Sequence, residues 1–92
     1  MKVRLRLYGG LKAMVGSREI ELELPEGIEL RGLSPLLRSR CGEGLFRLLG
    51  EQGPFGHLRV LINGRDHFTL QGQKTVLADG DTVTFIPLIV GG

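Results

Sequence analysis

Residues 74–92 read KTVLADGDTVTFIPLIVGG, and they contain the strand around which the rest of the fold must be arranged. Asp79-Gly80-Asp81 has the composition of a tight turn, because short polar side chains beside a glycine bond their own backbone. The apolar run from Thr84 to Val90 then predicts a strand, with Val83 and Phe85 facing the core.

Two further strands are expected at the start of the chain. Residues 2–8, KVRLRLY, alternate charged and apolar side chains, and residues 18–25, REIELELP, do the same. A period of two indicates strands with one buried face and one charged face. Arg4 and Arg6 are expected opposite the glutamates of the second strand, which would make the two strands a hairpin. Between them, Leu11–Gly16 has room for only a turn or two of helix.

The main helix is indicated by a change of period after residue 30. Apolar residues then recur three or four apart, which gives one apolar helical stripe; they are Leu33, Leu36, Leu37, Cys41, Leu45, Leu48 and Leu49. Proline fits best in a first turn, so Ser34 is expected near the N-cap, or else Pro35 lies within an early turn that begins near Arg31. The glycines around Glu43 are expected to weaken the helix.

A further strand follows in LRVLIN, residues 58–63, with Val60 and Ile62 on one face and Leu61 on the other. Asn63-Gly64 is a strong turn dipeptide. Residues 65–73, RDHFTLQGQ, predict an irregular excursion or an edge strand.

This order of elements predicts an α+β fold. The simplest arrangement lays the last strand parallel to the first in the centre of the sheet, with the helix crossing over one face. That arrangement is a β-grasp: a mixed sheet of four to five strands packed on one main helix. We expect a single domain over residues 1–92 with a flexible C-terminal Gly-Gly tail.

Composition excludes several classes of function. Twelve basic and ten acidic residues are well mixed, and Trp is absent, so neither a polybasic stripe nor a stacking platform for nucleic acid is expected. No apolar run is long enough to span a membrane, and the N-terminus lacks a secretion signal, so the expected location is cytoplasmic. The lone Cys41 cannot form an internal disulfide, and its place on the apolar stripe favours a small buried hydrophobe over a reactive thiol.

Side chains that could carry catalysis are few. His57 and His67 lie in loop-like contexts and are expected to be solvated. Asp66 beside His67 suggests a dyad, but no Ser or Cys lies in a recognisable nucleophile elbow. Two aspartates make a poor metal site alone, so Asp79 and Asp81 are assigned to the turn. We therefore predict no catalytic residues, no metal and no bound cofactor.

The terminal Gly91-Gly92 is the remaining candidate. Two glycines are thin and flexible, so such a tail can enter a narrow channel until its carboxylate meets an activating group. The carboxylate is an anion at neutral pH and a poor electrophile, and it reacts only after conversion to a form with a good leaving group, such as an adenylate. The plain alternative is a frayed end without a task. Leu88 and Val90 favour the activated tail over the frayed end, because exposing these apolar side chains to water without a partner protein would be unfavourable.

The sequence resembles the ubiquitin-like sulfur carriers, especially the small subunit of molybdopterin synthase and its relatives. The resemblance covers essentially the whole chain and is carried by VRLRLYGGLKAMVG, the central helix, VLINGR and LADGDTVTFIPLIVGG. It implies that a ubiquitin-activating-type enzyme uses ATP to adenylate Gly92. Sulfur from a persulfide donor then replaces AMP, and the resulting thiocarboxylate serves a precursor bound to the large subunit of molybdopterin synthase.

The docking surface is predicted on the sheet face away from the helix. Leu61 and Ile86 would be its apolar centre, Leu88 and Val90 would extend it along the tail, and Arg59 with Arg65 would ring it and steer an acidic partner.

The alternative functions differ in what happens to the chain end. The chain could be a protein modifier joined through Gly92 to lysines, a sulfur donor for tRNA thiolation, or a thiamine sulfur carrier. It could also be a β-grasp binding module with an inert tail, whose function would survive loss of Gly91-Gly92.

Overall fold

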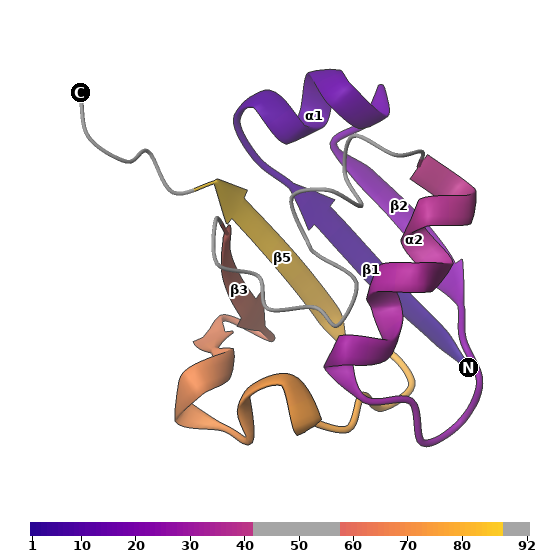
Figure 1. Ribbon diagram of the computed structural model, residues 1–92, viewed down its shortest axis with the longest axis vertical. Helices are drawn as coiled ribbons and strands as arrows, with labels where there is room; N and C mark the ends of the chain where they lie inside the picture. The colour runs from indigo at the N-terminus through magenta and orange to yellow at the C-terminus, as the bar shows by residue number, and fades with distance from the viewer. Residues whose placement is uncertain (42–57, 88–92) are drawn as a thin grey trace.

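The computed structural model describes residues 1–41 and 58–87, without the side chains of Met14 and Cys41. The strands, helices and 3-10 turns (η) follow one another along the chain as shown in Figure 1: β1 (Lys2–Leu7), α1 (Gly10–Val15), β2 (Glu19–Glu23), η1 (Leu30–Gly32), α2 (Leu33–Cys41), β3 (Leu58–Ile62), β4 (Arg65–Asp66), η2 (His67–Thr69), η3 (Gly72–Lys74) and β5 (Thr82–Pro87).

The sheet has the strand order β2-β1-β5-β3-β4. β5 runs parallel to β1, with Leu5 opposite Val83 and Leu7 opposite Phe85, whereas β2 is antiparallel to β1 and β3 is antiparallel to β5. The last strand is therefore central, as the sequence predicted, and the β-grasp arrangement is confirmed.

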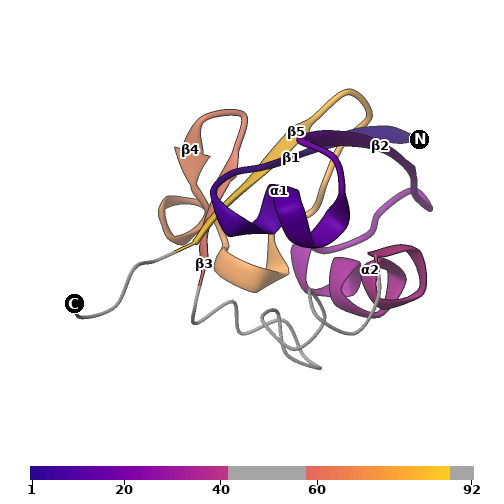
Figure 2. The same cartoon turned by 90° about the horizontal axis from the view of Figure 1, so that it is seen from above.

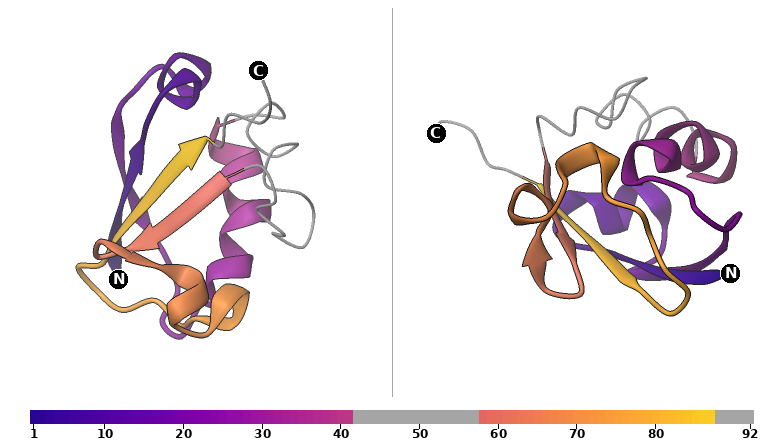
Figure 3. Two further views of the ribbon diagram at one scale, coloured as in Figure 1. Left: turned by 90° about the vertical axis from the view of Figure 1, so that its left-hand side faces the viewer. Right: turned by 90° about the horizontal axis from the view of Figure 1, so that it is seen from below.

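The core lies between the sheet and α2, which form two layers in Figures 2 and 3. Period-two spacing turns one face of each strand inward, and Leu30, Leu33 and Leu37 face it from η1 and α2. The buried apolar side chains are Val3, Leu5, Leu7, Leu11, Leu22, Leu24, Leu30, Leu33, Leu37, Leu58, Val60, Ile62, Leu77, Val83 and Phe85.

The start of the main helix corrects one detail. Ser34 is not the N-cap: α2 begins at Leu33 and continues directly from η1, which begins at Leu30. This is close to the alternative of an early turn near Arg31. Pro35 thus lies in the first turn of α2, where its missing N–H breaks no helical hydrogen bond. The predicted stripe after residue 41 lies outside the described residues.

The turn before β5 ties the two central strands together. Asp81 Oδ2 accepts a hydrogen bond from the Ala78 amide at 2.8 Å, and Gly80 adopts a φ of +85°. Asp79 Oδ1 accepts from the Lys2 amide of β1 at 2.8 Å. From the other side, Asn63 Oδ1 accepts from the Thr82 amide at 2.9 Å. The two aspartates therefore do the turn chemistry that the sequence predicted, and they fix the register of β5.

The charged face of the first hairpin is also as predicted. Arg4 Nε lies 3.0 Å from Glu19 Oε1, and Arg6 Nε lies 3.5 Å from the other oxygen of the same carboxylate. These pairs are exposed, so each contributes at most about 1 kcal/mol to stability.

Within the described ranges, no helix has the length and apolar character needed to cross a membrane.

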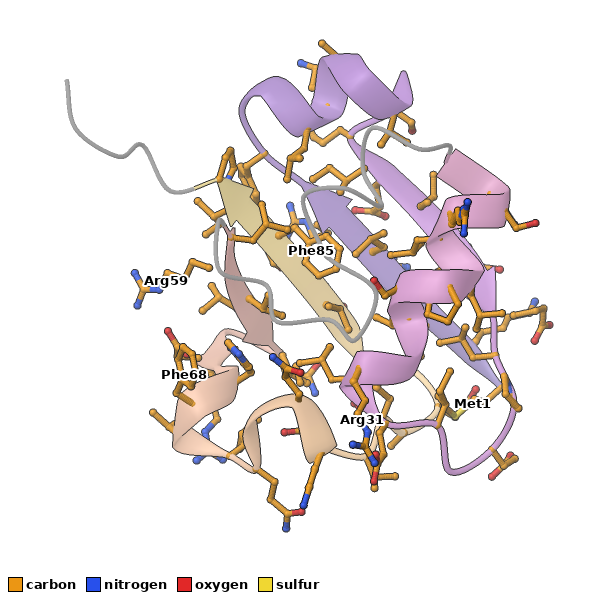
Figure 4. The ribbon with its side chains drawn as sticks, viewed as in Figure 1. Met1, Arg31, Arg59, Phe68 and Phe85 are labelled. Atoms are coloured by element: carbon orange, nitrogen blue, oxygen red, sulfur yellow. The ribbon has the colours of Figure 1, made fainter. Side chains whose placement is uncertain are left out.

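The two phenylalanines shown in Figure 4 test this account of the core. Phe85 is fully buried, whereas Phe68 is 77% exposed. We expect Phe85→Ala to lower the free energy of unfolding by about 3–5 kcal/mol, because it leaves a cavity in the central strand. Phe68→Ala is the matched control and should change that free energy by no more than about 0.5 kcal/mol. Urea unfolding of both variants checks this, and equal losses would contradict the assigned core.

Candidate functional site

The point at which the chain leaves the sheet is defined by Pro87, the last residue of β5. Leu58 of β3 lies opposite Pro87 in the sheet. On the other side, the chain after β1 turns into α1, so β5 ends at the same end of the molecule as this short helix (Figure 1). The predicted activation site Gly91-Gly92 and the predicted contacts Leu88 and Val90 lie outside the described residues. The structure therefore describes the C-terminal segment only as far as Pro87, which we call the base of the tail.

The outer face of the sheet carries the two apolar residues predicted for docking. Leu61 lies opposite Thr84, and Ile86 lies opposite Arg59. Cross-strand partners share a face, and the intervening residue Val60 is buried in the core, so these side chains lie on the face away from α2. Both Leu61 and Ile86 are half-buried.

A shallow groove of about 380 Å³ runs across this face. It is lined by Arg6, Tyr8, Leu61, Asn63, Gly64, Thr82, Thr84 and Ile86. These residues come from β1, β5, β3 and the turn after β3, because β1, β5 and β3 are adjacent in the sheet. We call this surface the outer-face groove.

Sequence reasoning missed Arg6 and Tyr8 as lining residues. The sequence pattern could have identified them. Arg6 and Tyr8 continue the alternation that places Arg4 on the outer face, and β1 is next to β5 in the sheet. The Arg6 guanidinium carbon lies 6.0 Å from the centroid of the Tyr8 ring, a cation–π arrangement that holds both side chains at the groove.

The expected place of Arg65 needs correction. Arg65 lies opposite Ile62, which is buried in the core, whereas Asp66 lies opposite Leu61. Arg65 is therefore on the other face of the hairpin, and Asp66 takes its place beside the groove. The reason is the two-residue turn at Asn63-Gly64, which sets the register of β4.

Arg59 lies on the same face as the outer-face groove, opposite Ile86, and it pairs with Asp66. Its Nε lies 3.3 Å from Asp66 Oδ2, and its side chain remains 58% exposed. Figure 4 shows it projecting away from the sheet. The guanidinium therefore remains accessible to solvent although it is paired.

The carboxyl of Asp66 has a pKa below its usual value. The largest cause is the hydrogen bond that its Oδ1 accepts from the Phe68 amide at 3.0 Å. Partial desolvation opposes this effect, and the hydrogen bond from Arg59 adds to it. Asp66 is thus both the cap of η2 and the partner of Arg59.

The prediction that His67 is a solvated loop histidine is wrong. Its side chain is 1% exposed, because the η2 turn folds it beneath β3, where Nδ1 lies 3.3 Å from the Val60 carbonyl oxygen and 3.5 Å from Asp66 Oδ1. His57 lies outside the described residues. Among residues 1–41 and 58–87, no group of three or more His, Cys, Asp or Glu side chains could hold a metal ion.

Comparisons with known proteins agree with this architecture. The ThiS family model matches residues 5–92. The chain is 34% identical to small archaeal modifier protein 3 of Haloferax volcanii and 28% identical to a putative sulfur carrier protein of Archaeoglobus fulgidus, in each case over all of both chains.

Solved structures give the same result. The Haloferax volcanii HVO 2177 protein superimposes with a TM-score of 0.84 at 31% identity, covering 100% of this chain and 87% of that one. The fold also matches one chain in a complex of subunits 1 and 2 of the molybdopterin-converting factor from Helicobacter pylori, with a TM-score of 0.62 at 22% identity, covering 100% of this chain and 100% of that one. The same fold thus occurs within a protein–protein complex.

The sheet order and the single main helix define a ubiquitin-like protein of the β-grasp class. The chain belongs to the ThiS family, and it is a ubiquitin-like protein of the sulfur-carrier and small-archaeal-modifier kind.

The pKa of Asp66 provides a test of the groove edge. We expect a carboxyl ¹³C titration to give a value below the usual 3.8. The ionised form is favoured in the folded state, so Asp66 stabilises the protein above its unfolded pKa, and this contribution is lost as the pH falls through the folded pKa. Arg59→Gln should move the pKa part of the way back up. Arg65→Gln, on the other face, is the control and should leave the pKa of Asp66 unchanged. An equal pKa change in the two variants would contradict the pairing of Arg59 with Asp66.

Proposed function

We propose that this protein is a sulfur carrier whose Gly92 carboxylate is adenylated and converted to a thiocarboxylate, which donates sulfur in molybdopterin biosynthesis. The single observation that carries the proposal is the Gly-Gly end placed five residues beyond Pro87, the last residue of the central strand, in a chain of the ThiS family.

The chemistry follows from the poor reactivity of a carboxylate. A Gly92 oxygen attacks the α-phosphorus of ATP in an activating enzyme, which releases pyrophosphate and leaves an acyl adenylate. The terminal sulfur of a donor persulfide then attacks the acyl carbon and expels AMP, giving an acyl disulfide. A thiol cleaves this disulfide, so the carrier keeps the thiocarboxylate and the donor leaves in a disulfide. The ATP belongs to the activating enzyme, and this chain supplies the acyl group.

A partner protein must bind the folded domain while Gly92 is adenylated and while the thiocarboxylate later gives up its sulfur. The outer-face groove is suited to this, because Leu61 and Ile86 provide an apolar centre and Arg59 an accessible cation beside it. We propose it as the surface that docks on the activating enzyme and then on the large subunit of molybdopterin synthase. A cytoplasmic location remains part of this proposal.

A second candidate is a protein modifier joined to lysines through Gly92, or a sulfur donor for tRNA thiolation. The 34% identity to a small archaeal modifier protein favours it over an inert tail. All of these functions begin with the same adenylate and differ in the acceptor: a lysine amine attacks the activated acyl carbon, whereas in sulfur transfer the thiocarboxylate sulfur attacks an electrophilic acceptor.

The proposal is tested by charging the purified protein. We expect ATP, a cognate activating enzyme and a persulfide donor to increase the intact mass by the difference between sulfur and oxygen, with the change on Gly92. A variant lacking Gly91-Gly92 is the control and should show no change. An unchanged mass of the full chain, with an activating enzyme that charges its own known substrate, would contradict the proposal.

The docking surface is tested by placing a charge in the groove. Ile86→Asp and Leu61→Asp should each weaken binding to the activating enzyme about tenfold or more, because a buried carboxylate in an apolar contact is costly. Val76→Asp is the matched control, since Val76 is 56% exposed and lies outside the groove. Binding by calorimetry, with the fold checked by amide spectra, should separate the two groups. Equal affinities would rule out this face.

A further inference from the structure

Gly9 packs against the base of the tail. It has a φ of +57° and a ψ of −140°, a conformation that residues with a Cβ rarely adopt. A Cβ on Gly9 would lie 3.0 Å from Cγ and 3.6 Å from Cδ of Pro87. The glycine therefore satisfies two constraints at once: the turn from β1 into α1, and the close approach of the proline ring.

The hydrogen bonds between β1 and β5 explain why the two residues meet. The Arg4 amide donates to the Asp81 carbonyl at 2.9 Å, and the Tyr8 amide donates to the Phe85 carbonyl at 3.2 Å. In a parallel ladder of this register, the next bond would run from the amide of residue 87 to the Tyr8 carbonyl. Pro87 has no amide hydrogen, so the ladder ends there and the chain after Tyr8 turns across the proline ring.

Pro87 is also a stiff residue. Its ring fixes φ near −65°, and it restricts Ile86 before it to extended conformations. Leu58 of β3 lies on its other side. The proline is thus held between β3 and Gly9 at the last described position of the central strand.

We propose that Gly9 is a positioning residue: by admitting the Pro87 ring, it fixes the direction in which the chain leaves the sheet towards Gly92. This inference rests on the proposed function and adds to it. Residues 88–92 can span at most about 17 Å. Gly92 follows Pro87 by five positions in the sequence, so the direction of the chain at Pro87 bears on where the carboxylate can reach, and a displacement of only ~1 Å at a reacting group can cost about a hundredfold in rate.

Neighbouring glycines supply matched controls. Gly16 also has a positive φ, +85°, but a Cβ there would meet nothing within 4 Å. Gly10 has neither a positive φ nor a neighbour within 4 Å. Gly16→Ala therefore imposes backbone strain without a clash, and Gly10→Ala imposes neither.

The experiment measures adenylation of the full chain by its activating enzyme, as kcat and KM from pyrophosphate exchange, for Gly9→Ala, Pro87→Ala, the double variant and the two controls. Gly9→Ala should lower kcat by at least about tenfold with KM within about twofold, because Leu61 and Ile86 at the centre of the outer-face groove are unchanged and the main effect falls on the placement of the carboxylate. Pro87→Ala should also lower kcat, since it removes the ring that directs the chain.

The double variant separates the contact from backbone strain. Alanine at position 87 lacks Cγ and Cδ, so adding Gly9→Ala to Pro87→Ala should lower kcat by less than about threefold more. Hydrogen exchange of the Tyr8 amide gives a readout that does not depend on the enzyme: it should rise in Gly9→Ala and return towards the level of Pro87→Ala in the double variant.

Two results would overturn the inference. The first is a Gly9→Ala variant that matches Gly16→Ala in kcat and in the exchange rate of the Tyr8 amide. The second is an equal fold-loss of kcat when Gly9→Ala is added to the wild type and to Pro87→Ala. If Gly9→Ala does not fold, an unchanged kcat and Tyr8 exchange in Pro87→Ala overturns it. If the wild-type chain is never adenylated, the proposed function fails, and the exchange measurements still decide whether Gly9 and Pro87 act together.

Discussion

The parallel pairing of β1 with β5 is the contact on which the rest of the structure depends. It joins the first and last strands of the described sheet, and its inward residues, among them Leu5 and Phe85, are fully buried. Parallel neighbours need a long connection, so most of the chain lies between them and supplies α2 as the cover for their shared face. The turn around Asp79 and Asp81, bonded to Lys2 and Asn63, sets the register of this pair.

Because β5 is central, the chain leaves the fold from the middle of the sheet and next to the outer-face groove. Ile86 belongs to that groove, and Pro87 follows it directly. A partner seated on the groove would therefore hold the protein within a few residues of the end that it must charge. Under the proposed function, the position of β5 would thereby set where the reactive end of the chain begins.

Most of the fold could be predicted from the sequence, because it depends on periodicity and on connection rules. Alternation in residues 2–8 and 18–25 predicted the first two strands, and the length of the crossover from the second strand through the helix supported the parallel pairing of the first and last strands. The facing of Leu61 and Ile86 followed from the same alternation. The face of Arg65 and the burial of His67 could not be read, because they depend on how residues 65–73 fold after the Asn63-Gly64 turn, and the sequence left that segment as an irregular excursion or an edge strand. The approach of Gly9 to Pro87 depends on the pairing of segments far apart in the chain, and no local pattern contains it.

The central claim is that the working part of this molecule is the terminal carboxyl of Gly92, displayed by a β-grasp body. The most direct test is the chemical state of that group in protein recovered from the cells that make it, with a thiol-reactive probe and intact-mass analysis. The account predicts a fraction carrying a thiocarboxylate, or Gly-Gly remnants on lysines of other proteins if the acyl group itself is transferred. Finding only free carboxylate, together with normal growth of cells whose chain lacks Gly91-Gly92, would contradict it.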